Sequence, residues 1–136
     1  MKVLMDTNVL ISAYYFKGNE RRLLQLIIEN KISGIISPYI ILELKNIMIN
    51  KFKENKEDTE KFVGKLLSVM DLTSDYKLEV DIRHEKDKTI IGSAVISDCD
   101  YLITGDNDIL EVKKYNKLKI INASKFINDV LKLKIE

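Results

Sequence analysis

Short, continuously apolar segments bounded by turn residues are the feature that most restricts the fold of this chain. Four stand out, at residues 2–5 (KVLM), 34–37 (GIIS), 101–104 (YLIT) and 118–121 (LKII), and a weaker fifth lies near 69–72. Their length and lack of alternation are typical of strands that are buried on both faces, as in a parallel sheet. Parallel strands need long connections, so the intervening segments should be helical.

Those intervening segments do show helical periodicity. Apolar residues recur at helical spacing in residues 19–30, 38–52, 86–97 and 123–133, and Pro38 suits a first helical turn. The charge-rich stretch at residues 51–61 is either a solvated turn and helix start or a substrate-facing edge. The alternation of strands and helices predicts an α/β fold with a doubly wound sheet, and the length fits a single domain over residues 1–136.

The composition limits the kinds of function. Hydrophobic residues make up 46% of the chain and charged residues 32%, which predicts a folded protein, and the net charge of +1 provides no global field for nucleic acid or membrane. Any basic binding surface must therefore be local. The single cysteine, Cys99, cannot form an internal disulfide, and the chain start lacks the long apolar core of a signal peptide. We expect a soluble, cytoplasmic protein.

Two aspartates directly follow predicted strands. Asp6 comes after the first apolar run, and Asp106 follows the run that ends at Thr104. In open α/β sheets, ligands bind outside the carboxyl ends of the strands. If these two strands are neighbours, both carboxylates face one cleft.

Two further acids lie near the apolar faces of predicted helices. At 100° per residue, Glu43 lies about 40° from Ile47 on the margin of its helix stripe, and Asp87 lies about 20° from Ala94. Glu43 either points into a site or extends its carboxylate to solvent. Asp87 is either a plain N-cap or an inward-facing ligand at a helix start.

These four acids share one expected location, the carboxyl edge of the sheet. Several carboxylates within a few ångströms repel one another in a low dielectric unless a cation is present. All-oxygen ligands favour Mg²⁺ or Mn²⁺ over zinc, and such ions promote phosphodiester hydrolysis. The pattern therefore favours a metal-dependent site that acts on phosphodiesters.

The segments "VLMDTNVLISA", "SPYIILEL" and "DKTIIGSAVISDCDYLITGDNDIL" together resemble the PIN domain family, in particular its small prokaryotic VapC-like branch of toxins. The early "DTNVL" and the late "DYLITGD" are specific as a pair. The resemblance implies a PIN-like (Rossmann-like) three-layer sandwich with a five-stranded parallel sheet of order 3-2-1-4-5 flanked by helices. It also implies an Mg²⁺ or Mn²⁺ dependent endoribonuclease.

The resemblance assigns roles position by position. The acids that match the family's catalytic set are Asp6, Glu43, Asp87 and Asp106, and three of them, Asp6, Asp87 and Asp106, are expected to hold the metal. Asn8, Thr104 and Asp108 match accessory positions. No histidine is needed as a general base, and the only one, His84, is expected in an exposed loop.

Partners follow from the resemblance as well. It implies RNA as the substrate, a cognate antitoxin protein and a homodimer. Three basic residues, Lys17, Arg21 and Arg22, either line an RNA path or form a solvated helix start. The alternatives are a PIN protein that binds or processes RNA without a toxin role, and a phosphoryl-transfer enzyme of receiver or phosphatase type. The latter is disfavoured because "DTN" lacks the second acid of an Asp-x-Asp motif.

Overall fold

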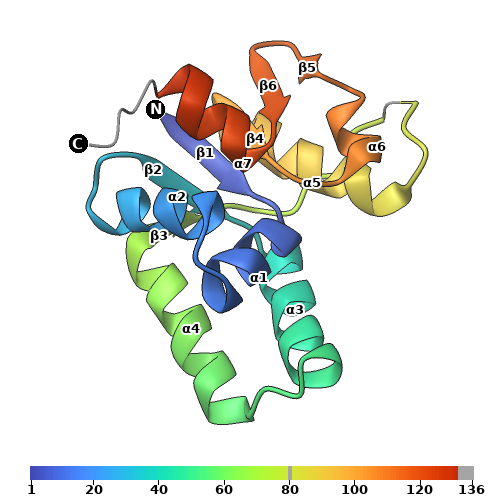
Figure 1. The fold of residues 1–136 in the computed structure, drawn as a ribbon. Helices are drawn as coiled ribbons and strands as arrows, with labels where there is room; N and C mark the ends of the chain where they lie inside the picture. Colours follow the sequence, from blue (N-terminus) through green and yellow to red (C-terminus); the bar gives the residue numbers. More distant parts are fainter. Residues whose placement is uncertain (80, 132–136) are drawn as a thin grey trace.

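Six strands form the centre of the computed structural model, which describes residues 1–79 and 81–131 (Figure 1). They are β1 (Lys2–Met5), β2 (Ser33–Ile36), β3 (Met70–Leu72), β4 (Tyr101–Ile103), β5 (Lys114–Tyr115) and β6 (Leu118–Ile121). The order across the sheet is β3-β2-β1-β4-β6-β5, and the first five of these are parallel. The predicted order 3-2-1-4-5 is thus confirmed for the parallel strands.

The sheet departs from the prediction at one edge. The short strand β5 pairs antiparallel with β6, with Lys114 opposite Lys119 and Tyr115 opposite Leu118, so the sheet has six strands rather than five. A two-residue strand has no apolar pattern of its own, and its pairing is created by the tight connection to β6. The predicted α/β class and the parallel core are unaffected.

The connecting segments are helical, as the periodicity predicted. They are α1 (Thr7–Tyr15), α2 (Asn19–Ile28), α3 (Pro38–Asn46), α4 (Lys56–Val69), α5 (Glu85–Ile96), α6 (Asn107–Leu110) and α7 (Ala123–Lys125). The helix that contains α3 continues as a π-helical turn, η1 (Ile47–Lys51), and α7 continues as η2 (Phe126–Val130). The end of the predicted C-terminal helix lies outside the described residues. The charge-rich stretch is a short loop followed by the start of α4.

Helices lie on both sides of the sheet. In Figure 1, α2 and α7 lie in front of the strands and α5 lies behind them, while α3 and α4 extend together away from the sheet. Side-chain caps fix several helix starts: Ser37 Oγ accepts from Ile40 N at 3.2 Å, and Asn55 Oδ1 accepts from Asp58 N at 2.7 Å. No helix in the described ranges is long and apolar enough to cross a bilayer.

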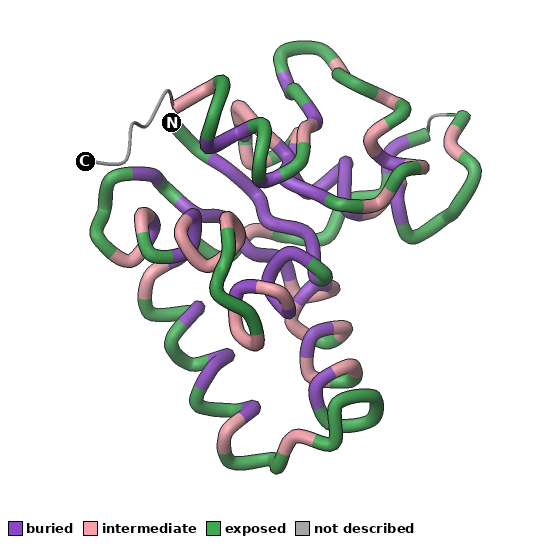
Figure 2. The backbone as a smooth tube through the Cα atoms, in the orientation of Figure 1, coloured by how far each residue is buried: buried purple, intermediate pink, exposed green. Residues whose placement is uncertain are grey.

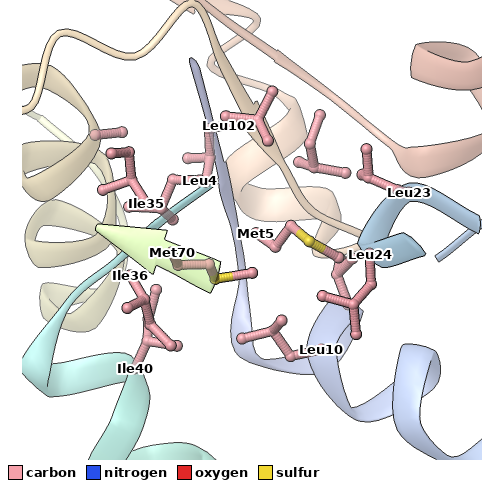
Figure 3. Packing of buried hydrophobic residues seen from close by; sticks show 14 of the residues in the cluster. Leu4, Met5, Leu10, Leu23, Leu24, Ile35, Ile36, Ile40, Met70 and Leu102 are labelled. Atoms are coloured by element: carbon pink, nitrogen blue, oxygen red, sulfur yellow. The ribbon is translucent and has the colours of Figure 1, made fainter. Parts of the chain in front are cut away.

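Buried residues follow the strands and the helix faces turned toward them (Figure 2), and most of these residues are apolar. Leu4, Met5 and Leu102 lie at the centre of the sheet and contact helix residues such as Leu10 and Leu23 (Figure 3). Burial on both faces explains the continuously apolar strands. This packing fixes the carboxyl ends of β1 and β4 beside each other, with Met5 opposite Ile103.

Candidate functional site

Asp6 is held at the junction of β1 and β4. Its backbone N–H donates to the Ile103 carbonyl at 2.9 Å, which extends the strand pairing by one residue. Its carboxylate accepts from Thr104 Oγ1 at 2.8 Å and from the Thr7 backbone N–H at 2.7 Å. The side chain is only 5% exposed. Asp6 therefore has a fixed orientation at the carboxyl edge of the sheet.

The electrostatic surroundings of Asp6 disfavour its charged form. Burial raises the pKa of its carboxyl above the usual value, and the hydrogen bonds from Thr104 and Thr7 oppose that rise. The negative charges of Glu43 and Asp106 raise the pKa of Asp6 further. A cation beside Asp6 would lower this pKa, because a nearby positive charge favours the ionised carboxylate.

Glu43 approaches the same region from α3. Thr7 Oγ1 donates to Glu43 Oε1 at 2.5 Å, and the Tyr39 hydroxyl donates to Glu43 Oε2 at 3.3 Å. The half-buried carboxylate therefore points inward rather than to solvent. Sequence reasoning did not identify Thr7 and Tyr39 as supports, although Tyr39 lies four residues before Glu43, a spacing at which helical side chains meet.

Asp87 is the most deeply buried of the four acids. The helix α5 begins at Glu85 with His84 at its N-cap, so Asp87 lies inside the first turn and is not the N-cap. Its side chain is 0% exposed, and neither carboxylate oxygen has a hydrogen-bond partner among the described residues. Burial, followed by the charge of Asp106, raises its pKa. Asp87 therefore faces the interior and is not a plain N-cap.

Asp106 begins α6 directly after the turn at Gly105. Its Oδ1 accepts from the Asp108 backbone N–H at 2.9 Å, and its own N–H donates to Thr104 Oγ1 at 3.1 Å. Thr104 therefore contacts both aspartates that follow the paired strands. Asp106 itself is half-buried, with its second carboxylate oxygen uninvolved in this cap.

Asp108 is directed toward a different group of residues. Its carboxylate lies 3.0 Å from His84 Nε2 and 3.7 Å from a guanidinium nitrogen of Arg83. His84 is exposed, as expected, and marks the start of α5 rather than a free loop. These contacts join the start of α5 to α6, next to the acids but outside their cavity.

All four acids line one small cavity of about 50 Å³, which we call the acid cavity. Its lining residues are Asp6, Asn8, Glu43, Ile47, Lys86, Asp87, Ile90 and Asp106. The structure thus brings together the four acids that the sequence singled out, with Asn8 exposed at the rim. Lys86, which sequence reasoning did not identify, adds a positively charged side chain to the lining of the acid cavity.

The acids share a cavity without forming a ready-made ligand shell. Across residues 1–79 and 81–131, no three histidine, cysteine, aspartate or glutamate side chains are placed to bind one metal ion together. The donor chemistry nevertheless fits a hard divalent cation, because every acidic donor is an oxygen and both oxygens of the buried Asp87 are unpartnered. Such a group is costly unless it is neutralised or paired.

The predicted basic residues lie elsewhere. Lys17, Arg21 and Arg22 line a shallow hollow of about 500 Å³ at the start of α2, separate from the acid cavity. The Arg21 guanidinium donates to the carbonyls of Ala13 and Tyr14 at 2.9 and 2.6 Å, so it satisfies the end of α1. Arg21 thus has a structural contact whatever else it binds.

Comparison with known proteins gives a family match and a fold match. A family model described as PIN domain matches residues 2–108, which include all four acids. Among solved structures, the crystal structure of VapBC2 from Rickettsia felis bound to a DNA fragment from their promoter contains a similar chain. The TM-score is 0.66 at 20% sequence identity, covering 90% of this chain and 98% of that chain. The curated proteins include no match.

Proposed function

This chain belongs to the PIN domain family, and on that premise we propose that it is a metal-dependent endoribonuclease. Its substrate is RNA, its cofactor is Mg²⁺ or Mn²⁺, and its biological role is that of the toxin in a toxin–antitoxin pair. We extend the proposal to the whole chain, with residues 1–136 forming one PIN domain that acts in the cytoplasm.

The observation that supports this function best is the state of Asp87. A fully buried carboxylate with two unpartnered oxygens, in a cavity shared with Asp6, Glu43 and Asp106, destabilises the protein unless a cation binds there. A purely structural acid would be expected to have hydrogen-bond donors around it. Binding of a cation for catalysis would explain why the protein retains a buried carboxylate that destabilises its metal-free fold.

In this proposal Asp6, Asp87 and Asp106 hold the ion, and Glu43 completes the site or helps to hold a second ion. A divalent cation bound there supplies Lewis-acid chemistry for phosphodiester hydrolysis. Thr104 and Thr7 fix the orientation of Asp6, while Thr7 and Tyr39 fix that of Glu43. Asn8, which lines the acid cavity, is the accessory residue that supports these acids.

The overall reaction is hydrolysis by in-line displacement. A water molecule adds to phosphorus, the bond from phosphorus to the 3′ oxygen breaks, and the 3′ oxygen takes up a proton. The products are a 5′ phosphate and a 3′ hydroxyl. The oriented carboxylate of Glu43 is suited to receive the proton that the attacking water loses, so no histidine is needed.

The test is RNA cleavage by the purified protein with Mn²⁺. Asp6→Asn or Asp106→Asn should lower activity by at least ~100-fold if a metal ligand is removed. The matched control is Asp98→Asn, because Asp98 is exposed, lies outside the acid cavity and has a left-handed backbone that asparagine tolerates. Equal activity in the wild type and the Asp6 variant would refute the proposal and indicate contamination.

A partner protein and a second copy are also part of the proposal. The fold shared with VapBC2 of Rickettsia felis supports a cognate antitoxin for this chain, and small proteins of this kind are expected to form homodimers. Expression of the chain alone should arrest growth, and co-expression of a small protein encoded beside it should restore growth. Arrest that persists in the Asp6→Asn variant would argue against a nuclease toxin.

The surface formed by Lys17, Arg21 and Arg22 remains a proposed RNA contact. It rests on the positive charge around a hollow at the start of α2. The rival function is a PIN protein that binds RNA or a partner without cutting. Calorimetric titration separates the two, because absence of Mg²⁺ and Mn²⁺ binding would favour the rival.

A further inference from the structure

Another hollow, distinct from the acid cavity, is lined by residues of α6, β5, β6 and α7 and of the segments that connect them. Its volume is about 640 Å³, and its lining includes four exposed lysines, which we call the groove lysines: Lys113, Lys114, Lys119 and Lys125. The rest of the lining is apolar or an amide, namely Leu110, Ile120, Ile121 and Asn122. The hollow is therefore strongly basic in a chain whose net charge is only +1.

The groove lysines form no ion pairs among the described residues, unlike their neighbour Lys117. Within residues 1–79 and 81–131, none of the four has a carboxylate within 4.0 Å, whereas nearby Lys117 contacts Asp98 and Asp100 at 3.0 and 3.7 Å. Lys114 and Lys119 are directly opposite each other in the β5–β6 pair. Like charges in that arrangement repel and destabilise a sheet. An anion in the hollow would remove that cost.

Backbone hydrogen bonds fix the main-chain positions from which Lys113 and Lys125 extend. Lys113 adopts a left-handed conformation with φ of 67°, which is uncommon outside glycine, asparagine and aspartate. Its N–H donates to the Leu110 carbonyl at 3.1 Å, and its carbonyl accepts from Ile120 N at 2.8 Å. The start of α7 is fixed by Asn122 Oδ1, which accepts from Lys125 N at 2.8 Å. The groove lysines thus extend from a fixed framework.

A smaller hollow lies between the lysine-lined hollow and the acid cavity. It has a volume of about 100 Å³ and includes Thr104 and Gly105 in its lining. It shares Asn8 with the acid cavity and Asn122 with the lysine-lined hollow. These adjoining hollows define a track from the four acids, past Gly105, to the four lysines, and its middle part is lined by the apolar residues Val9 and Ala123 and the acid Glu20 as well as by polar residues.

Protection of a sheet edge is the simplest competing explanation. Lysines on an edge strand discourage strand-to-strand aggregation, and β5 is the edge of this sheet. That explanation covers Lys114. It leaves out Lys113, which precedes the strand, Lys119, which lies on the inner strand β6, and Lys125, which lies on a helix.

We propose that the groove lysines bind the phosphates of the RNA strand on one side of the scissile bond, and that the strand follows this track into the acid cavity. The inference rests on the proposed ribonuclease function and adds a location for the substrate. Phosphate binding by lysine is independent of base sequence, so this surface would position the strand rather than select its sequence.

The experiment measures RNA binding separately from RNA cleavage. The groove variant carries Lys114→Gln, Lys119→Gln and Lys125→Gln, and leaves Lys113 unchanged because of its backbone conformation. The control variant carries Lys56→Gln, Lys61→Gln and Lys65→Gln, which remove the same charge from the exposed side of α4, away from the track (Figure 1). Fluorescence anisotropy with a labelled single-stranded RNA in EDTA reports affinity without cleavage.

The groove variant should bind RNA roughly tenfold or more weakly, and the dependence of log affinity on log salt should lose a slope of about 2, since each of three phosphate contacts contributes about 0.7 for single strands. The control variant should change affinity less than about twofold, as expected for charges that make no phosphate contact. A third variant, with arginine at the same three groove positions, should restore binding. Thermal melts of all three variants separate lost binding from lost folding.

Three outcomes would overturn the inference. These are equal RNA affinity in the groove variant and the wild type, equal loss in the groove and control variants, and failure of the arginine variant to restore binding. Cleavage assays with Mn²⁺ then distinguish this inference from the proposed function. If the wild type binds RNA through the groove but does not cleave it, the groove proposal stands and the nuclease proposal fails.

Discussion

Thr104 Oγ1 donates a 2.8 Å hydrogen bond to Asp6 Oδ2, across 98 positions of sequence. The same oxygen accepts from the Asp106 backbone N–H at 3.1 Å. One buried hydroxyl therefore connects the acid after β1 with the acid that begins α6. It sets the relative position of two carboxylates that repel each other.

Replacing Thr104 by valine should damage both the fold and the site. The substitution keeps the shape but removes the hydrogen bonds, and it leaves Asp6 and the Asp106 N–H each with one partner fewer. We expect a loss of about 1–2 kcal/mol in the free energy of unfolding, measured by urea titration. The proposed metal-dependent cleavage should fall about 10-fold or more, because Thr104 orients Asp6, a proposed metal ligand.

Thr104→Ser is the matched control, because serine keeps the hydroxyl and loses only a methyl group. It should retain most of the activity that the valine variant loses. Equal activity in the two variants would mean that the hydroxyl has no part in positioning Asp6.

Asp87→Asn should stabilise the metal-free protein. The native carboxylate is fully buried and unpartnered, and its pKa is raised by burial and by Asp106. A neutral amide of the same size removes the charge, although it remains without hydrogen bonds. We expect a gain of about 1 kcal/mol in the free energy of unfolding in EDTA at neutral pH.

The same variant should lose the response to metal. Addition of Mn²⁺ should raise the melting temperature of the wild type, because a ligand that binds the native state stabilises it, and should leave the variant nearly unchanged. A lower melting temperature for Asp87→Asn in EDTA would identify the acid as a structural group instead.

The stability of the metal-free protein should depend on pH through the same carboxyls. The folded-state pKa values of Asp6 and Asp87 are raised above 3.8, the value of an unperturbed aspartate. Between the unfolded-state pKa and the raised folded-state pKa of each carboxyl, the folded protein binds more protons than the unfolded protein. The free energy of unfolding therefore falls as the pH rises from the first value to the second. The loss is complete once the pH exceeds the folded-state pKa values.

Other acids act in the opposite sense, since the pKa of Asp100 is lowered by its hydrogen bond to Lys2 N. The informative quantity is therefore the difference between wild type and Asp87→Asn in chemical denaturation at a series of pH values. The stability advantage of the variant should grow as the pH rises. An advantage that is constant with pH would contradict the assignment of a buried, ionising Asp87.

The parallel core of the fold was predictable because the signal is local. Runs such as KVLM and YLIT are apolar throughout, and only strands buried on both faces require that pattern. The edge strand β5 escaped prediction because its two residues pair only after β6 has been placed. The helix around Ile47–Lys51 was expected, but its π-helical hydrogen bonding depends on packing that the periodicity does not report.

In the candidate site, too, some features were predictable from local sequence and others depend on the three-dimensional fold. Asp87 faces inward because of its angular position on α5, which sequence periodicity predicts. The contact between Thr7 and Glu43 joins residues 36 positions apart on two helices, and it depends on how α1 and α3 cross. The groove lysines are scattered over two strands, a turn and a helix, so their proximity emerges only from the three-dimensional fold.

A final prediction concerns Gly92, which allows α5 to pack under residues 74–78. A Cβ built at Gly92 would lie 1.7 Å from the Tyr76 carbonyl oxygen, a backbone atom that cannot swing aside. The crossing segment is also fixed by Ser93 Oγ, which donates to the Ser74 carbonyl at 3.1 Å. Gly92→Ala should therefore displace this segment from α5 and lower the free energy of unfolding by about 3 kcal/mol.

Gly64 provides the matched control, because it is exposed within α4 and a Cβ there would meet nothing within 4 Å. Gly64→Ala should raise the free energy of unfolding by about 0.5–1 kcal/mol through the better helix propensity of alanine. Urea denaturation of the two variants should thus shift the midpoint in opposite directions. If Gly92→Ala is neutral, the segment at residues 74–78 does not cross α5 this closely. The orientation of Asp87, five residues earlier on the same helix, would then need a different support.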